Sequence, residues 1–188
     1  MDVAASSLWN KKSNKYIYVS ENFSLSTSEQ LKYISKLIEE FEIFYVEDPF
    51  HEDDFESFSE IQEMHKDTII VGDDLYASNK NRLIEGIKKK SSKGIIIKPN
   101  QVGCLTKILE TIKFSKENNI IPIVSHRSGE TEDIFISHLA VSMDIPLIKT
   151  GTVSGERVCK LNELIRIEEM YKEKVEINKY ISNLIRGN

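Results

Sequence analysis

The 188-residue chain has only two cysteines, four prolines and one tryptophan. Cys104 and Cys159 lie far apart with no CxxC spacing, so we expect two reduced thiols in the core and not a disulfide framework. No apolar run approaches the ~18 residues of a membrane span. The first residues also lack the basic-then-apolar order of a signal peptide. These absences predict a cytoplasmic protein that does not enter a membrane.

The chain also lacks an excess of positive charge. It has 25 lysines and arginines against 30 aspartates and glutamates, a net charge of −5, and the basic residues are mixed with acidic ones. This distribution weighs against binding to nucleic acid, although a few placed cations could still hold a small anionic ligand. Neither GxGxxG nor GxxxxGK[ST] occurs, which weighs against a nucleotide site of the Rossmann or P-loop kind.

What the chain does have is a regular alternation of short β-rich runs and longer stretches with helical periodicity. An amphipathic stretch at 28–41, with Ser28 as its N-cap, is typical of the helices between the runs, and a long charged helix is expected at 155–185. Nearly continuous apolar strands alternating with helices predict a parallel sheet in one domain, 1–188. Two architectures fit this alternation, a doubly wound open sheet and a (β/α) barrel. The expected strands are 43–48, 68–74, 94–100, 121–129 and 146–151.

Charged and hydroxyl side chains recur at the C-terminal end of each predicted strand. Asp2, before a run of small residues, extends the pattern to the start of the chain. Each of these residues alone could be a helix cap or a turn residue, and Asp48 before Pro49 fits ordinary turn chemistry. Together they favour a barrel, because a parallel barrel gathers those ends around one pocket. The residues are Glu47, Asp48, Asp73, Asp74, Lys98, Ser125, His126, Arg127, Ser128 and Lys149.

The residue types in this pattern indicate a particular chemistry. Three carboxylates from separate strands, without cysteine or paired histidine, suit a hard cation such as Mg²⁺. A lysine opposite the metal can act as a general base. An arginine and a serine just before "GETED" suit a phosphate group. The sequence therefore predicts proton abstraction next to a carboxylate on a small phosphorylated acid.

Six stretches resemble the signatures of the enolase family and occur in the family's order. They are "VEDPF", "VGDDL", "IKPNQVG", "VSHRSGETED", "IKTG" and "KLNELIRIEE", and "MDVAAS" resembles the metal-binding end of an earlier barrel strand. The resemblance runs from residue 1 to about residue 169 and has archaeal features such as "KPNQ". It implies the C-terminal part of an enolase, a partial (β/α)8 TIM-type barrel from about its third strand onward.

The resemblance also implies a reaction and a role for each site residue. Enolases convert 2-phosphoglycerate to phosphoenolpyruvate in glycolysis and gluconeogenesis and require Mg²⁺. Asp2, Glu47 and Asp73 would be the carboxylate ligands of the metal, and Lys98 would remove the C2 proton. The implied substrate-binding residues are Glu47, Asp73, His126, Arg127, Ser128 and Lys149, with Arg127 and Ser128 on the phosphate and Lys149 on the carboxylate.

Some parts of the family pattern are not matched. The family's N-terminal domain with its closing loops, and the early strands with the glutamate that acts as general acid, fall outside the resemblance. The family's "AASEF" reads "AASSL" at residues 4–8. An incomplete barrel would leave two exposed strand edges, which favour aggregation.

Three hypotheses follow from the match and its gaps. The chain is the C-terminal part of an enolase that acts within a complete or complemented enzyme, with a separate N-terminal part or a homo-oligomer as partner. Alternatively, it is an inactive relative that binds metal or a phospho-acid or serves as a scaffold, or it is another metal-dependent member of the wider superfamily. The specificity of "SHRSGETED" and the retention of the family's site residues favour the first hypothesis.

Overall fold

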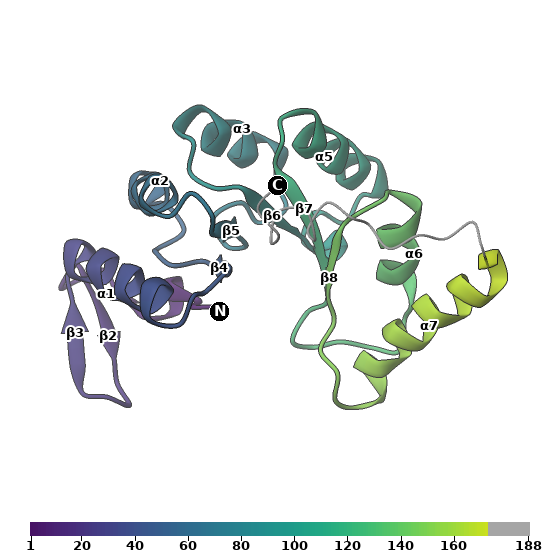
Figure 1. The fold of residues 1–188 in the computed structure, drawn as a ribbon, viewed down its shortest axis with the longest axis horizontal. Coiled ribbons are helices and arrows are strands. Elements are labelled where there is room, and N and C mark those ends of the chain that lie inside the picture. Colours follow the sequence, from purple (N-terminus) through teal and green to yellow (C-terminus); the bar gives the residue numbers. More distant parts are fainter. Residues whose placement is uncertain (173–188) are drawn as a thin grey trace.

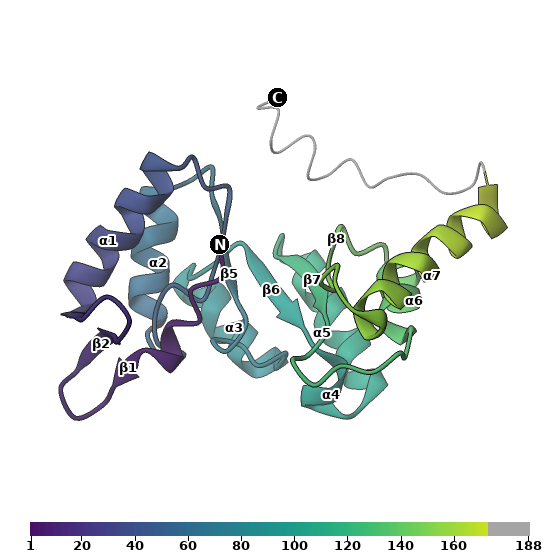
Figure 2. The same ribbon diagram turned by 90° about the horizontal axis from the view of Figure 1, so that it is seen from below.

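A curled, five-stranded parallel sheet forms the centre of the molecule. The computed structural model describes residues 1–172. The strands pair in their sequence order, β4-β5-β6-β7-β8, and all four pairings are parallel. Figures 1 and 2 show them in a curved row. The strands are β4 (Tyr45–Glu47), β5 (Ile69–Gly72), β6 (Gly94–Ile97), β7 (Ile121–Ser125) and β8 (Leu147–Lys149).

This strand order decides between the two expected architectures. A doubly wound sheet reverses its strand order at a switch point, whereas a barrel adds each strand beside the previous one. The described strands follow the second pattern, which confirms the partial (β/α) barrel. The segment that begins the chain lies beside β4, where Asp2 forms an isolated parallel bridge to Glu47.

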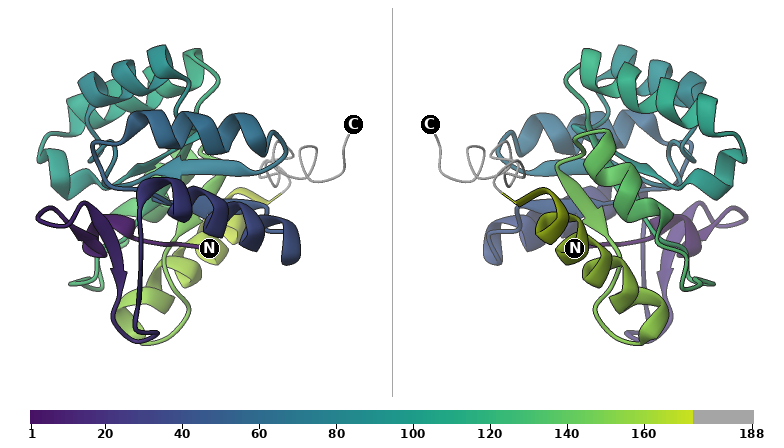
Figure 3. Two further views of the ribbon diagram at one scale, coloured as in Figure 1. Left: turned by 90° about the vertical axis from the view of Figure 1, so that its left-hand side faces the viewer. Right: turned by 90° about the vertical axis from the view of Figure 1, so that its right-hand side faces the viewer.

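Helices lie along the convex side of the half-barrel (Figure 1), and both side views show the teal helices above the strands (Figure 3). The helices α2, α3, α5 and α6 alternate with the strands, while α7 packs on α6. No helix of the described residues is both long and apolar enough to cross a membrane. The helices are α1 (Thr27–Glu40), α2 (Phe55–Met64), α3 (Lys80–Lys89), α4 (Pro99–Val102), α5 (Leu105–Glu117), α6 (Phe135–Ser142) and α7 (Gly155–Tyr171).

Both faces of the parallel sheet are apolar, which explains why its strands read as continuous hydrophobic runs. Successive side chains of a strand point to opposite faces. In β6, Ile95 and Ile97 belong to the large core beneath the helices, whereas Ile96 packs with Val71 and Ile123 in a second cluster. The two clusters hold the strands in register, so that the residues following each strand meet at one edge.

A small antiparallel sheet near the start of the chain was not predicted. It consists of β1 (Trp9–Asn10), β2 (Lys15–Tyr18) and β3 (Phe23–Leu25), and it packs against α1. Such short strands carry little periodicity, and tertiary contacts stabilise them. The ring of Tyr18 stacks on Phe23 at 4.6 Å, and the buried Tyr16 hydroxyl accepts the backbone N–H of His51 at 3.0 Å.

The first predicted helix begins earlier than expected. Its N-cap is Ser26 and not Ser28, because Ser26 forms a capping box with Glu29. The Glu29 carboxylate accepts the backbone N–H of Ser26 at 2.8 Å, and the Ser26 hydroxyl accepts that of Glu29 at 3.4 Å. Only a residue three positions before a glutamate can form this reciprocal pair.

Two expectations about buried residues were wrong. Cys104 is exposed and Cys159 is half-buried, although both are free thiols as predicted. The second expectation was that helical spacing places Leu161, Leu164 and Ile165 of α7 in the core, but the first two are half-buried and Ile165 is 54% exposed. The helix instead turns a different and more polar face inward, that of Lys160, Glu163 and Ile167. The expected continuation of this helix to residue 185 lies outside the described residues.

Gly86→Ala is expected to destabilise the fold. A Cβ at Gly86 would lie against the ring and hydroxyl of the fully buried Tyr76, which is hydrogen-bonded to Ser92 at 2.7 Å. Overpacking costs ~1–3 kcal/mol, and the better helix propensity of alanine recovers about 1 kcal/mol at most. The urea midpoint should therefore fall by roughly 0.5 M. Gly129→Ala, whose Cβ would meet no atom within 4 Å, should leave it unchanged. Equal midpoints for both variants would contradict the prediction.

Candidate active site

The predicted site residues gather at the C-terminal edge of the parallel sheet. Glu47 and Lys149 are the last residues of β4 and β8, while Asp73 and Lys98 directly follow β5 and β6. Asp2 reaches the same edge because its neighbours pair with β4: Val3 N–H donates to the Glu47 carbonyl, and Glu47 N–H donates to the Met1 carbonyl, each at 2.9 Å. Strand geometry thus brings together residues that are far apart in sequence.

Lys149 connects the two ends of the half-barrel. Its ammonium group donates to Asp2 Oδ2 at 2.9 Å and to Glu47 Oε1 at 2.8 Å. Burial acts to lower the pKa of Lys149, but the hydrogen bonds to these two carboxylates outweigh it and leave the pKa raised. Lys149 is therefore a fixed cation at the mouth of the site.

Glu47 is a buried carboxylate with a second partner. It is 1% exposed, and its Oε2 accepts a hydrogen bond of 2.8 Å from the Tyr45 hydroxyl two residues earlier on the same face of β4. Burial raises the pKa of Glu47, and the contact with Lys149 opposes that rise. Burial, followed by the charge of Glu47, likewise raises the pKa of Tyr45, which keeps the phenol protonated as a donor.

Asp73 and Lys98 form an ion pair that uses one of the two carboxylate oxygens of Asp73. The Lys98 ammonium contacts Asp73 Oδ2, and the two side chains are 15% and 10% exposed. Asp73 Oδ1 is buried and has no hydrogen-bond partner among the described residues. A buried carboxylate oxygen without a partner is costly, and binding a cation is one way to satisfy it.

Asp48 holds Asp73 in place. Its two carboxylate oxygens accept the backbone N–H groups of Asp73 at 2.9 Å and Asp74 at 2.7 Å. Its own carbonyl accepts the N–H of Ala5 at 3.1 Å, and its backbone has a positive φ of 44°. Burial raises the pKa of Asp48 to about 8, and the two backbone donors oppose the rise. Asp48 therefore joins three chain segments that each carry a predicted metal ligand.

The predicted anion-binding residues lie on the loop after β7. His126 is half-buried, whereas Arg127 and Ser128 are exposed. The guanidinium of Arg157 on α7 contacts the His126 ring and also donates to the Ser128 carbonyl at 3.3 Å. Burial and then the charge of Arg157 lower the pKa of His126, so the imidazole is neutral at neutral pH. Arg127 donates to the amide oxygen of Asn100 at 3.4 Å.

Comparison with known proteins agrees with this geometry. Residues 1–183 match the family model described as "Enolase, C-terminal TIM barrel domain". The chain belongs to the enolase family.

Named enolases of archaea are similar over most of the chain. The "Enolase" of Methanosphaera stadtmanae is 51% identical over 170 residues, which are 90% of this chain and 41% of that protein. That of Methanothermobacter thermautotrophicus is 49% identical over the same shares of each chain. That of Pyrobaculum aerophilum is 49% identical over 89% of this chain and 39% of its own length. The chain thus spans about two fifths of these relatives.

The carboxylates at this sheet edge fit a hard divalent cation, because all the donors are oxygens and one of them is buried without a partner among the described residues. Among the described residues, two groups have ligand atoms within 4.8 Å of one another: one is Asp48, Asp73 and Asp74, and the other is the loop group 51–53, in which Glu52 and Asp53 are exposed. The predicted ligands Asp2, Glu47 and Asp73 do not have their carboxylate oxygens within 4.8 Å of one another. Lys149 pairs with Asp2 and Glu47, and Lys98 pairs with Asp73. That these three residues form one metal site stays a prediction.

Sequence reasoning missed two residues of this sheet edge and gave a third no specific role. Asp48 was placed among the strand-end residues, but its contact with Asp73 and Asp74 was not predicted, although the spacing of "ED" and "DD" on neighbouring parallel strands indicates that the two pairs meet. Nothing in the sequence indicated that Arg157 and Lys160 on α7 face the site, because charged residues of a helix usually face solvent. Their contacts with the loop after β7 depend on how α7 packs.

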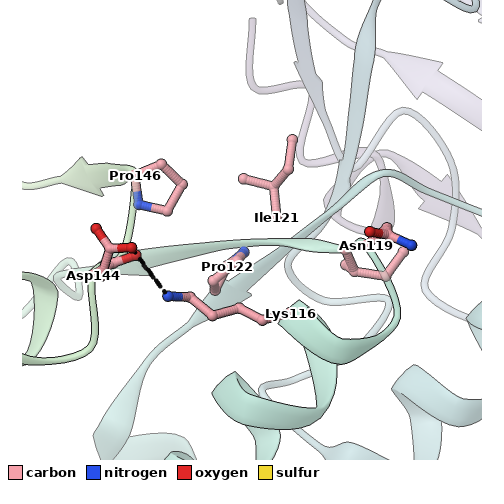
Figure 4. Close-up of a pocket in the computed structure, with 7 residues that line it drawn as sticks. Lys116, Asn119, Ile121, Pro122, Asp144 and Pro146 are labelled. Carbon is pink, nitrogen blue, oxygen red and sulfur yellow. Dashed lines mark hydrogen bonds and ion pairs between the residues drawn. The ribbon is translucent and has the colours of Figure 1, made fainter. Parts of the chain in front are cut away.

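A separate cavity of about 380 Å³ lies at the opposite, N-terminal end of β7 and β8 (Figure 4). Ile121, Pro122 and Pro146 supply much of its lining. The Lys116 ammonium beside it donates to the carbonyls of Met143 and Asp144 at 2.6 and 2.7 Å. The Lys116 ammonium group is therefore already hydrogen-bonded within the protein. The predicted site residues lie at the other end of the strands.

Proposed function

We propose that this chain carries the metal-binding, proton-abstracting and anion-binding parts of an enolase. The reaction is the Mg²⁺-dependent dehydration of 2-phosphoglycerate to phosphoenolpyruvate, within a complete or complemented enzyme of cytoplasmic glycolysis and gluconeogenesis. The observation that carries the proposal is the cluster of two lysines and three acids at one sheet edge in a member of this family. The partner would be a separate N-terminal part or further copies of the chain.

Lys98 is the proposed base for the C2 proton. It follows β6, and its backbone N–H donates to the Ser78 hydroxyl at 2.8 Å, which fixes where the side chain starts. Asp73 contacts the side-chain nitrogen of Lys98. That nitrogen would take the C2 proton as a neutral amine and become the ammonium form. Asp2, Glu47 and Asp73 would hold Mg²⁺, which when bound offsets their negative charge and that of the substrate carboxylate as C2 loses its proton.

The substrate's two anionic groups would contact different cations. Lys149 would neutralise the carboxylate, and the contacts of its ammonium group with Asp2 and Glu47 in the acidic cluster support this role. Arg127 and Ser128 would bind the phosphate from the exposed loop after β7, through guanidinium and hydroxyl donors. The neutral His126 between the two regions can donate or accept one hydrogen bond to the substrate.

The 188 residues expressed alone are expected to show almost no turnover. The glutamate that serves the family as general acid lies outside the matched residues, and loss of a positioned general acid costs about 10²–10⁴-fold. Formation of phosphoenolpyruvate from 2-phosphoglycerate and Mg²⁺, followed by ultraviolet absorbance, measures this against a full-length archaeal relative. Co-expression with that relative's preceding segment is the complementation control.

Two outcomes of this assay would change the proposal. Turnover by the 188 residues equal to that of the relative would place the general acid within this chain. A complemented assembly that binds Mg²⁺ and 2-phosphoglycerate without forming product would favour the alternative, an inactive metal- and phospho-acid-binding protein or scaffold.

A further inference from the structure

The proposed mechanism does not use Lys160, although it is a fully buried cation. The residue is 0% exposed in the second turn of α7. Its ammonium group donates to the carbonyls of Thr131 and Glu156, the latter at 2.5 Å, and lies 3.2 Å from Glu130 Oε1. Burying an ammonium group is costly unless it is paired and fully hydrogen-bonded. Two of its three acceptors belong to the loop after β7, so this cation ties α7 to that loop.

Glu130 connects Lys160 to Arg127, one of the residues that the proposed function assigns to the phosphate. Its Oε2 accepts the backbone N–H of Arg127 at 3.1 Å, and its Oε1 accepts that of Thr131 at 3.0 Å. Burial acts to raise the pKa of Glu130, but these backbone donors and Lys160 outweigh it and leave the pKa lowered. One ionised carboxylate thus closes the turn 127–131, and the buried ammonium group holds that carboxylate.

We propose that Lys160 is a positioning residue that acts through Glu130 to hold the turn 127–131 in the conformation that presents Arg127 and Ser128 to an anionic group of the substrate. The inference rests on the proposed function, because that function assigns the phosphate to these two residues. Arg157, one turn earlier on α7, contacts the same loop at His126 and Ser128. The inward face of α7 therefore supports the whole anion-binding loop.

The first test is hydrogen exchange in the 188-residue chain, compared between the wild type and Lys160→Met. The variant should raise the exchange rates of the Arg127 and Thr131 amides at least about tenfold, while the amides of β5 to β7 keep their rates. Arg166→Met is the matched control. It also removes an ion-paired cation from α7, but Arg166 pairs with Glu163 on the same helix and not with the loop. It should leave the loop amides unchanged.

Glu130→Gln provides a second variant in case Lys160→Met does not fold. It keeps the side-chain shape but removes the charge, and it should also release the two amides. If the two residues act as one unit, the double variant should exchange no faster than the more affected single variant. Unchanged loop amides in a folded Lys160→Met or Glu130→Gln variant would overturn the inference. A uniform rise in exchange over the whole chain would also overturn it, because it indicates a general structural role.

Inorganic phosphate, titrated with ³¹P detection, is the second readout. If the wild type binds phosphate, Lys160→Met should weaken binding about tenfold or more and Arg166→Met should not. Equal phosphate binding by the wild type and Lys160→Met would overturn the positioning role. Absence of binding by the wild type would count against the proposed function, while the exchange rates still decide whether Lys160 orders the loop.

Discussion

Lys98→Ala in a complemented assembly is expected to abolish exchange of the C2 proton of 2-phosphoglycerate with solvent, a loss of at least about 10²–10⁴-fold. The ammonium group at position 98 sits at the C-terminal edge of the sheet, paired with Asp73 and 15% exposed. Alanine removes the only proposed proton acceptor, and the oxygens proposed to hold the metal remain. Mg²⁺ binding should therefore stay close to that of the wild type.

Deuterium incorporation at C2, followed by NMR, measures the exchange directly, and two variants make the result specific. Lys93→Ala removes a lysine at the opposite end of β6 and should exchange at the wild-type rate. Arg127→Ala should raise KM and leave exchange at saturating substrate nearly intact, because it removes a contact made in ground and transition states alike. Unchanged exchange in Lys98→Ala would mean that another group is the base and that the proposed mechanism does not apply.

Asp73→Asn is expected to weaken binding of Mg²⁺ or Mn²⁺ to the 188-residue chain by at least about 100-fold. The carboxylate of Asp73 has one buried oxygen without a hydrogen-bond partner among the described residues, and asparagine keeps the shape but not the charge. Loss of a direct ligand should cost more than loss of an outer partner, which typically costs 10–100-fold. Calorimetric titration with Mg²⁺ or paramagnetic resonance of Mn²⁺ measures the affinity.

Two further variants distinguish a direct metal ligand from a carboxylate that acts indirectly and from one that does not contribute to metal binding. Asp48→Asn should weaken metal binding by about 10–100-fold, less than Asp73→Asn, because Asp48 acts through the backbone amides that it holds. Asp53→Asn, which changes an exposed residue of the loop group 51–53, should have no effect. Metal binding that survives Asp73→Asn but is lost in Asp53→Asn would move the site to that loop.

The sequence predicted the barrel segment and its site edge well, because both follow from local patterns. Apolar runs about 25 residues apart, each followed by an amphipathic helix, lead to a parallel sheet with sequential strands. In such a sheet the C-terminal ends necessarily lie at one edge, so residues such as Glu47 and Lys98 could be assigned to that edge without coordinates. The small sheet β1–β3 was not predicted, because its strands are too short to show an alternating pattern. Aromatic contacts between the strands stabilise it.

What the sequence by itself determined was which residues reach the C-terminal edge of the sheet, and the tertiary structure decided how they are held there. The bridge of Lys149 to Asp2 joins residues 147 positions apart, and no local pattern encodes it. The roles of Asp48 and Lys160 depend on hydrogen bonds whose partners lie on other elements. Side-chain periodicity reports only whether a residue faces inward, whereas the partner of a buried charge depends on how helices and strands pack around it.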